Sequence, residues 1–266
     1  MERDADRALT QGAYGEPMDL RIAMGVEDAL RFSAPEDPWL GLEVYLDPAL
    51  LEEDALFAKL ATGYEGILSV HLPFWNLDLV SPDPEVRNLT LRRLLLGLDR
   101  AAELGAERAV FHSGIPHGRT LEEALDRADR LIQALKPVVR RAGTLGVELV
   151  LENTHEPEPR ALAPILEAYP EVGFCFDAAH ARVFSRVPEP GPWLALEPDH
   201  LHLNDTDGLY DRHWNLGTGV LGHRTWLGPY LDRTLVLEVR VDPAPSVAFL
   251  RSLRESLPDR ALTEGA

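Results

Sequence analysis

The feature of this sequence that most constrains its fold is a short apolar run that recurs eight times. The runs lie at residues 20–24, 40–46, 66–71, 108–112, 147–152, 172–177, 200–204 and 234–239. Their apolar residues are continuous and do not alternate with polar ones, which is typical of parallel strands buried on both faces. The sequence therefore predicts eight parallel strands.

Helical patterns lie between several of these runs. Residues 84–104 carry leucines at helical spacing and are followed by Gly105, a residue type that commonly ends a helix. A longer helix is predicted at 120–145, kinked or divided by Pro137, and shorter ones at 157–168 and 243–257. Repeated strand–helix alternation predicts an α/β fold, a single (β/α)8 TIM barrel. The alternative, an open doubly wound sheet, is disfavoured because no glycine-rich phosphate loop follows the first strand.

One barrel accounts for most of the 266 residues. We expect the barrel at 19–266 and an N-terminal extension of unassigned role at 1–18, which is polar and has no secretory pattern. No apolar run approaches the roughly 20 residues that span a bilayer, and the lone Cys175 excludes an intrachain disulfide or a thiolate metal cluster. These features predict a cytoplasmic protein without a membrane partner, and they leave the oligomeric state open.

The acidic balance of the chain argues against a surface built to grip nucleic acid. The formal net charge is −18, whereas proteins that bind a phosphate backbone usually carry a basic patch. We interpret the negative charge as a feature that favours solubility.

Each of the six successive strands from the third to the eighth ends in a metal-ligand type of residue. These residues are His71, His112, Glu152, Asp177 followed by His180, His202, and Glu238, and the loop DRHWNLGTG adds Asp211 and His213. In a barrel the carboxyl ends of the strands converge on one face, where barrel enzymes keep their chemistry. Imidazole and carboxylate together suit Zn²⁺, Mn²⁺ or Fe²⁺ and do not select Ca²⁺. Four carboxylates converging without cations would repel one another.

Taken singly, each of these residues has a simpler explanation. A histidine at a strand end is often a hydrogen-bonded structural residue, and Asp177 has the residue type of a helix cap. Glu152 fits a loop salt bridge, and Glu238 fits an ion pair with Arg240. The joint pattern favours a metal centre over these separate interpretations.

Several other polar or aromatic residues receive secondary predictions. His200 is expected deeper along the strand of His202, and Glu43, inside the second strand, is expected to be structural. Contact with substrate or support of the ligands is considered for His155, Asn204, Asp205, Phe74, Trp75 and Trp214. The histidines expected in loops, with exposed side chains, are His117, His155 and His223.

The pattern resembles the xylose-isomerase-like barrel superfamily, and within it the endonuclease IV (AP endonuclease family 2) group. The similarity runs from about residue 19 to residue 240 and rests on HLPF, FHSG, LENT, CFDAAHA, HLHLND, DRHWNLGTG and LEV. All nine ligands of that family's three-metal centre have a counterpart here, in order. The resemblance implies Zn²⁺ and/or Mn²⁺, up to three ions per chain.

By position, the resemblance assigns the nine ligands to three ions. The first ion would take His71, His112 and Glu152. The second would take Glu152, Asp177, His202 and Glu238, and the third would take His180, Asp211 and His213. The candidate catalytic residues are Glu152, Glu238 and His180. Such a centre suits phosphoester hydrolysis.

The loops that bind DNA in endonuclease IV differ in this chain. The region after the second strand is the acidic DPALLEED, HEPEPR follows LENT, RVFSRVPEPGPW follows DAAHA, and GTG replaces the usual GEG. The apparatus for gripping and bending an abasic duplex is therefore altered.

Three functions remain open from the sequence. The first is a divalent-metal-dependent phosphoesterase acting on abasic DNA or a smaller phosphate ester. The second is a one-metal sugar or sugar-phosphate isomerase or epimerase, in which Glu152 and Glu238 exchange a proton. The third is a non-catalytic metal-binding barrel, because the fold alone does not separate these functions.

Overall fold

Eight parallel strands close into a barrel in a computed structural model that describes residues 18–32, 40–63 and 66–257. The strands are β1 Leu20–Gly25, β2 Leu40–Tyr45, β3 Ile67–His71, β4 Arg108–His112, β5 Glu148–Glu152, β6 Gly173–Asp177, β7 His200–Leu203 and β8 Thr234–Leu237. They follow one another in chain order, and β8 pairs with β1 to close the sheet, with Leu20 opposite Leu235. The predicted TIM barrel is confirmed, and the open sheet is excluded.

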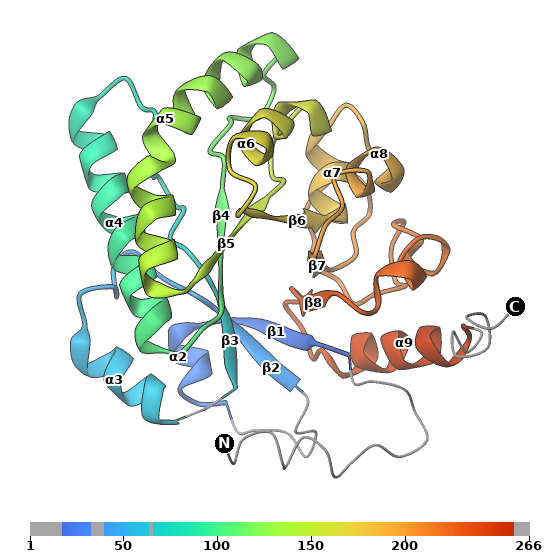
Figure 1. Ribbon diagram of the computed structural model, residues 1–266. Helices are drawn as coiled ribbons and strands as arrows, with labels where there is room; N and C mark the ends of the chain where they lie inside the picture. Colours follow the sequence, from blue (N-terminus) through green and yellow to red (C-terminus); the bar gives the residue numbers. More distant parts are fainter. Residues whose placement is uncertain (1–17, 33–39, 64–65, 258–266) are drawn as a thin grey trace, which may run out of the picture.

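Helices cover the outside of this barrel (Figure 1). They are α2 Val26–Ala29, α3 Asp54–Gly63, α4 Pro84–Glu103, α5 Leu121–Leu145, α6 Ala163–Ala168, α7 Ala178–Phe184, α8 Pro190–Leu194 and α9 Ala244–Glu255, with short 3-10 turns η1 Pro159–Ala161, η2 His223–Thr225 and η3 Gly228–Tyr230. The helix predicted at 157–168 is thus a 3-10 turn followed by α6. None of the described helices combines the length and the apolar character needed to cross a membrane. Apart from Met18, the predicted N-terminal extension lies outside the described residues.

Local sequence signals set the ends of the two long helices. Asp83 caps α4 by accepting the Glu85 backbone N–H, and a reciprocal capping box joins Thr120 and Glu123 at the start of α5. Gly146 ends α5 with a left-handed backbone, φ 70°. Pro137 lies inside α5, which bends but does not divide (Figure 1). The helix continues past this proline because its apolar face is buried on both sides of it.

Candidate metal centre

The predicted ligands lie together at the carboxyl ends of the strands. The parallel register puts several of them side by side on neighbouring strands, His112 opposite Glu152 and Asp177 opposite His202. Neighbouring strands of a sheet run only about 4.8 Å apart, so side chains at the same level can converge inside the barrel mouth. Because the strands follow one another around the barrel, the ligand-type side chains at their ends form a ring.

The first group joins two histidines to one carboxylate oxygen. Oε2 of Glu152 lies 3.1 Å from Nε2 of His71 and 2.9 Å from Nε2 of His112. The two Nε2 atoms are only 3.0 Å apart. One ligand atom from each of the three residues lies within 4.8 Å of the others. Because two imidazole nitrogens face the same carboxylate oxygen, all three atoms could bind one cation.

The second group uses the other oxygen of the same carboxylate. Oε1 of Glu152 lies 3.1 Å from Nδ1 of His202, which is also 3.1 Å from Oε1 of Glu238. Asp177 completes a fully buried set of four whose ligand atoms lie within 4.8 Å of one another. Glu152 therefore belongs to both groups, with one oxygen turned toward each.

The third group comes from the start of α7 and the loop before β8. Oδ2 of Asp211 lies 2.8 Å from Nε2 of His213 and 3.6 Å from Nε2 of His180. His213 has a left-handed backbone with φ 52°, a strained conformation for a residue with a side chain. In this conformation the imidazole faces Asp211. The structure thus brings together all nine residues that the sequence singled out.

Backbone carbonyl groups determine which nitrogen three of the histidines present. Nδ1 of His71 donates to the Leu72 carbonyl at 2.9 Å, and Nδ1 of His180 donates to the Asn153 carbonyl at 3.0 Å. Nδ1 of His213 donates to the Glu238 carbonyl at 2.8 Å. A carbonyl oxygen can only accept, so the proton of each neutral ring sits on Nδ1 and leaves the Nε2 lone pair for the centre. Metal-ligating histidines are oriented in this way.

Electrostatics inside the barrel mouth also favour cations. Burial raises the pKa of Asp177 to about 6, and repulsion from nearby carboxylates, Glu238 first among them, adds to the rise. Burial likewise lowers the pKa of the His112 imidazole to about 4. Burial opposes protonation of His180 and His202, but nearby carboxylates prevail and raise the pKa of both rings, so these two would exchange a proton for a metal ion. Imidazole nitrogens and crowded carboxylates are a donor set that fits divalent ions, since bound cations would remove the repulsion between carboxylates.

The helix-cap interpretation of Asp177 is confirmed, whereas Glu238, considered above as an ion-pair partner of Arg240, has a hydrogen bond to another residue. Asp177 does cap α7 by accepting the His180 backbone N–H at 2.8 Å, so it serves the helix and the cluster together. Glu238 accepts a hydrogen bond from the Tyr45 hydroxyl group. The sequence did not indicate this role of Tyr45, because the residue belongs to none of the motifs and lies 193 positions before Glu238.

A layer of polar residues supports the ligands from behind. The Asn204 amide donates to Oδ2 of Asp177 at 3.2 Å. Glu43, predicted to be structural, is fully buried with Oε1 2.9 Å from Nε2 of His202. Asp205 instead accepts N–H groups of its own loop segment, those of Gly217 and Leu221 among them.

The loop histidines differ from one another. His117 is exposed and His155 is half-buried. The prediction of an exposed His223 is wrong. Its ring is buried, because the turn η2 packs it against Trp226 and Phe249.

Aromatic residues line one side of the centre. Phe74 lies with its ring centroid 4.9 Å from that of His71 and 4.6 Å from that of His112. Trp75 packs on Phe74 at 5.0 Å and is 70% exposed, so its outer face is open to a ligand.

Comparisons with known proteins agree with this fold. The family model described as xylose isomerase-like TIM barrel matches residues 29–251. A Symbiobacterium thermophilum protein named probable endonuclease 4 is 31% identical over 221 residues, which cover 71% of this chain and 78% of that protein. A second protein of that name, from Methanoculleus marisnigri, is 28% identical over 66% of this chain and 70% of its own.

A solved structure is more similar still. A Thermus thermophilus protein soaked with ZnCl2 is 68% identical, with a TM-score of 0.85 over 91% of this chain and 100% of its own. A D-tagatose 3-epimerase-like protein is 20% identical, with a TM-score of 0.69 over 90% of this chain and 97% of its own. At that identity the second likeness concerns the fold alone.

Proposed function

Because the chain belongs to the xylose isomerase-like TIM barrel family, we propose that it is a divalent-metal-dependent phosphoesterase of the endonuclease IV type. The substrate would be abasic DNA or a smaller phosphate ester. The observation that carries this proposal is the third group, Asp211 with His180 and His213, which adjoins the two groups that share Glu152. A one-metal isomerase has no need of this third group. Curated relatives named probable endonuclease 4 support the proposal.

The ligands would divide among up to three ions in the same way as the three groups. Glu152 would bridge the first two ions, because each of its oxygens faces a different histidine cluster. Zinc is the first candidate, supported by the Thermus thermophilus relative that was soaked with ZnCl2, and manganese is the second. Bound divalent ions would supply Lewis acidity, which acidifies a nucleophilic water and neutralises charge that develops at phosphorus.

The residues of the chain itself would orient and shield these ions. Glu152 and Glu238 would present carboxylate oxygens to the ions, with Glu238 held by the Tyr45 hydroxyl. His180 would bind an ion through Nε2, since its Nδ1 proton is engaged by the Asn153 carbonyl. Phe74 excludes water from the His71 and His112 rings, and Trp75 offers a stacking face to a base or sugar.

The alternative is a sugar or sugar-phosphate isomerase or epimerase that uses one ion. The group of Glu152, Asp177, His202 and Glu238 is complete without the third group, and this favours the alternative. Glu152 and Glu238 would then act as the acid and base pair on a substrate carbon. On either function we propose a cytoplasmic location, which rests on the single cysteine.

The deciding experiment is cleavage of a duplex oligonucleotide with one abasic site, in Mn²⁺ or Zn²⁺, with Glu152→Gln as the matched control. We expect cleavage by the wild-type protein and none by the variant. If the duplex stays intact although the protein has bound metal, we would infer that the substrate is a smaller phosphate ester. Asp211→Asn separates the two enzyme classes, because a hydrolase would lose activity and an isomerase would keep it.

A further inference from the structure

A second layer of side chains lies inside the barrel directly beneath the candidate metal centre. Side chains two positions apart on a strand share a face, so each strand from β2 to β8 points a residue into the barrel below the level of the centre. These residues, all 0% exposed, are Glu43, Ser69, Val110, Val150, Cys175, His200 and Val236. TIM barrels usually fill this space with branched aliphatic residues. Here β2, β3, β6 and β7 contribute polar ones instead.

The polar part of this layer contains a cluster of unsatisfied atoms. Among the described residues, Oε1 of Glu43, both ring nitrogens of His200 and Nε2 of His202 have no hydrogen-bond partner. The carboxylate of Glu43 does lie within 3.1 Å of Nε2 of His200 and within 2.9 Å of Nε2 of His202. Neither pair is aligned as a hydrogen bond. Each buried polar group left unpaired costs about 1–3 kcal/mol, so a cation that binds these atoms would remove that cost.

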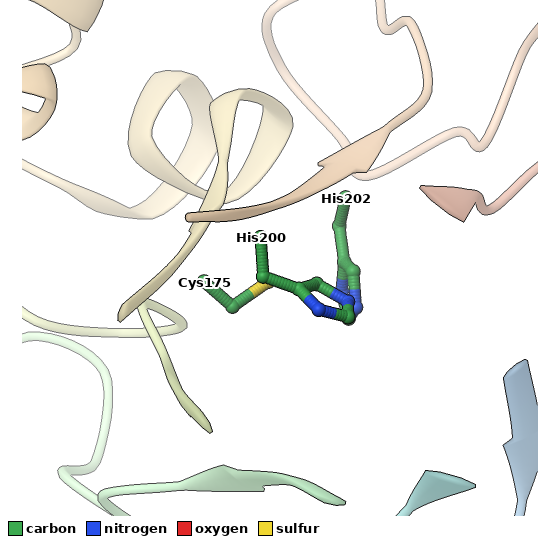
Figure 2. A group of neighbouring side chains, drawn as sticks. All are labelled: Cys175, His200 and His202. Carbon is green, nitrogen blue, oxygen red and sulfur yellow. The ribbon is translucent and has the colours of Figure 1, made fainter. Parts of the chain in front are cut away.

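We propose that Cys175, His200 and His202 hold a buried metal ion within the barrel, separate from the centre above it. One ligand atom from each of these residues lies within 4.8 Å of the others. Cys175 and His200 stand opposite each other on β6 and β7. Figure 2 shows both imidazole rings projecting to the same side of β7, with the Cys175 thiol beside them. The ring centroids are 5.3 Å apart.

The donor set selects the kind of ion. One sulfur and two imidazole nitrogens suit zinc, which takes such ligands tetrahedrally, and do not suit magnesium or calcium. The carboxylate of Glu43 lies beside this set, 3.1 Å from Nε2 of His200 and 2.9 Å from Nε2 of His202, and would offset the charge of the ion. A thiolate, a carboxylate and a dication together carry no net charge. That balance is what a dry interior requires.

His202 connects this inner site to the layer above. Its Nδ1 faces Glu152 and Glu238, while its Nε2 faces Glu43. To bind an ion above through Nδ1 and an ion below through Nε2 at the same time, the ring would have to lose its N–H proton and act as a bridging imidazolate. The inner site itself does not depend on the proposed phosphoesterase activity.

The test uses cobalt as the probe, because a thiolate bound to Co²⁺ gives a near-ultraviolet charge-transfer band that histidine and carboxylate ligands do not give. Since the site is fully buried, the full-length protein is produced in cobalt-supplemented medium and purified folded. Cys175 is the only cysteine, so any such band must come from this residue. We expect the band in the wild-type protein, its loss in Cys175→Ser, and one cobalt ion that resists brief chelation.

The matched control is His213→Ala, which alters the upper centre and should keep the band while losing one ion. Cobalt bound without the thiolate band in the wild-type protein would overturn the inner site and leave the upper centre intact. A protein free of both cobalt and zinc would overturn the inner site and also contradict the proposed function. The two failures are therefore distinguishable, and the wild-type spectrum decides even if a variant fails to fold.

Discussion

Glu152 illustrates how much of the site depends on single atoms. Its two oxygens face different histidines, and its side chain is 1% exposed. A carboxylate placed this deep is stable only among opposite charges or ligands. Residues that hold such ligands in place should therefore affect metal affinity without touching the substrate.

Tyr45 is the clearest of these supporting residues. Its hydroxyl group donates to Oε1 of Glu238, so Tyr45→Phe should free that carboxylate to rotate. Removal of a group that orients a ligand typically costs 10–100-fold in metal affinity. We expect a loss of that size in Zn²⁺ titration calorimetry, with an unchanged circular dichroism spectrum. Tyr230→Phe, in the turn η3, should bind zinc as the wild type does, and equal affinities for all three proteins would contradict the role.

Asp19 supplies a pH-dependent contribution to stability at the other end of the barrel. Burial opposes its ionisation, but hydrogen bonding and attraction from Arg21 prevail and lower the pKa of Asp19 below 3.8. A lowered folded-state pKa stabilises the protein above about pH 4, and the contribution is lost as the pH falls through the folded value. Asp19→Asn should therefore cost about 1 kcal/mol at pH 7, discounted for the exposure of Asp19.

Urea unfolding of both proteins at pH 7 and at pH 3 tests this. The difference between wild type and variant should shrink at the lower pH. If the difference in unfolding free energy between wild type and variant is the same at both pH values, the charge of Asp19 is not its cause.

At the scale of elements, the loop between β7 and β8 carries the third group. Asp211 and His213 lie in this loop, which is held by an isolated bridge between Asp205 and Trp214. The loop returns to the barrel at Gly219, whose backbone packs tightly on Thr206 and Asp205. The position of the third group therefore depends on the close approach of the Gly219 backbone to the backbone of Thr206, which only glycine allows.

Gly219→Ala should disturb this loop and leave the barrel intact. A Cβ atom there would collide with the Thr206 carbonyl oxygen, a backbone atom that cannot move aside. We expect metal analysis to show one fewer ion per chain, with cooperative unfolding preserved. Gly143→Ala is the control, because its Cβ would meet nothing within 4 Å and alanine favours the helix α5. A full complement of ions in Gly219→Ala would contradict this account.

At the scale of the whole molecule, the ions of the proposed centre would join the ends of β3 to β8. Ions that bind only the folded protein stabilise it in proportion to their occupancy. The crowded carboxylates, with the pKa of Asp177 raised to about 6, make the metal-free protein the less stable form. Binding of ions at this centre would therefore be thermodynamically coupled to folding of the barrel.

Removal of metal should lower the melting temperature. At an ion concentration about 1,000 times the Kd, binding contributes about 4 kcal/mol, which corresponds to roughly 10 °C for a domain of this size. Differential scanning calorimetry before and after chelation measures the shift, and added Zn²⁺ should reverse it. An identical melting temperature in both states would mean that no ion is bound selectively by the folded chain.

The sequence by itself determined the strands, the barrel and the nine clustered residues. The reason is that apolar runs buried on both faces predict parallel strands, and the carboxyl ends of parallel strands must meet at one face. Only the tertiary structure decided the contacts between strands that are distant in the chain. Tyr45 reaches Glu238 across 193 positions, and Glu43 reaches His200 and His202. These pairings follow from how the barrel closes and staggers its strands, which no local pattern records. The burial of His223 likewise depended on packing against α9.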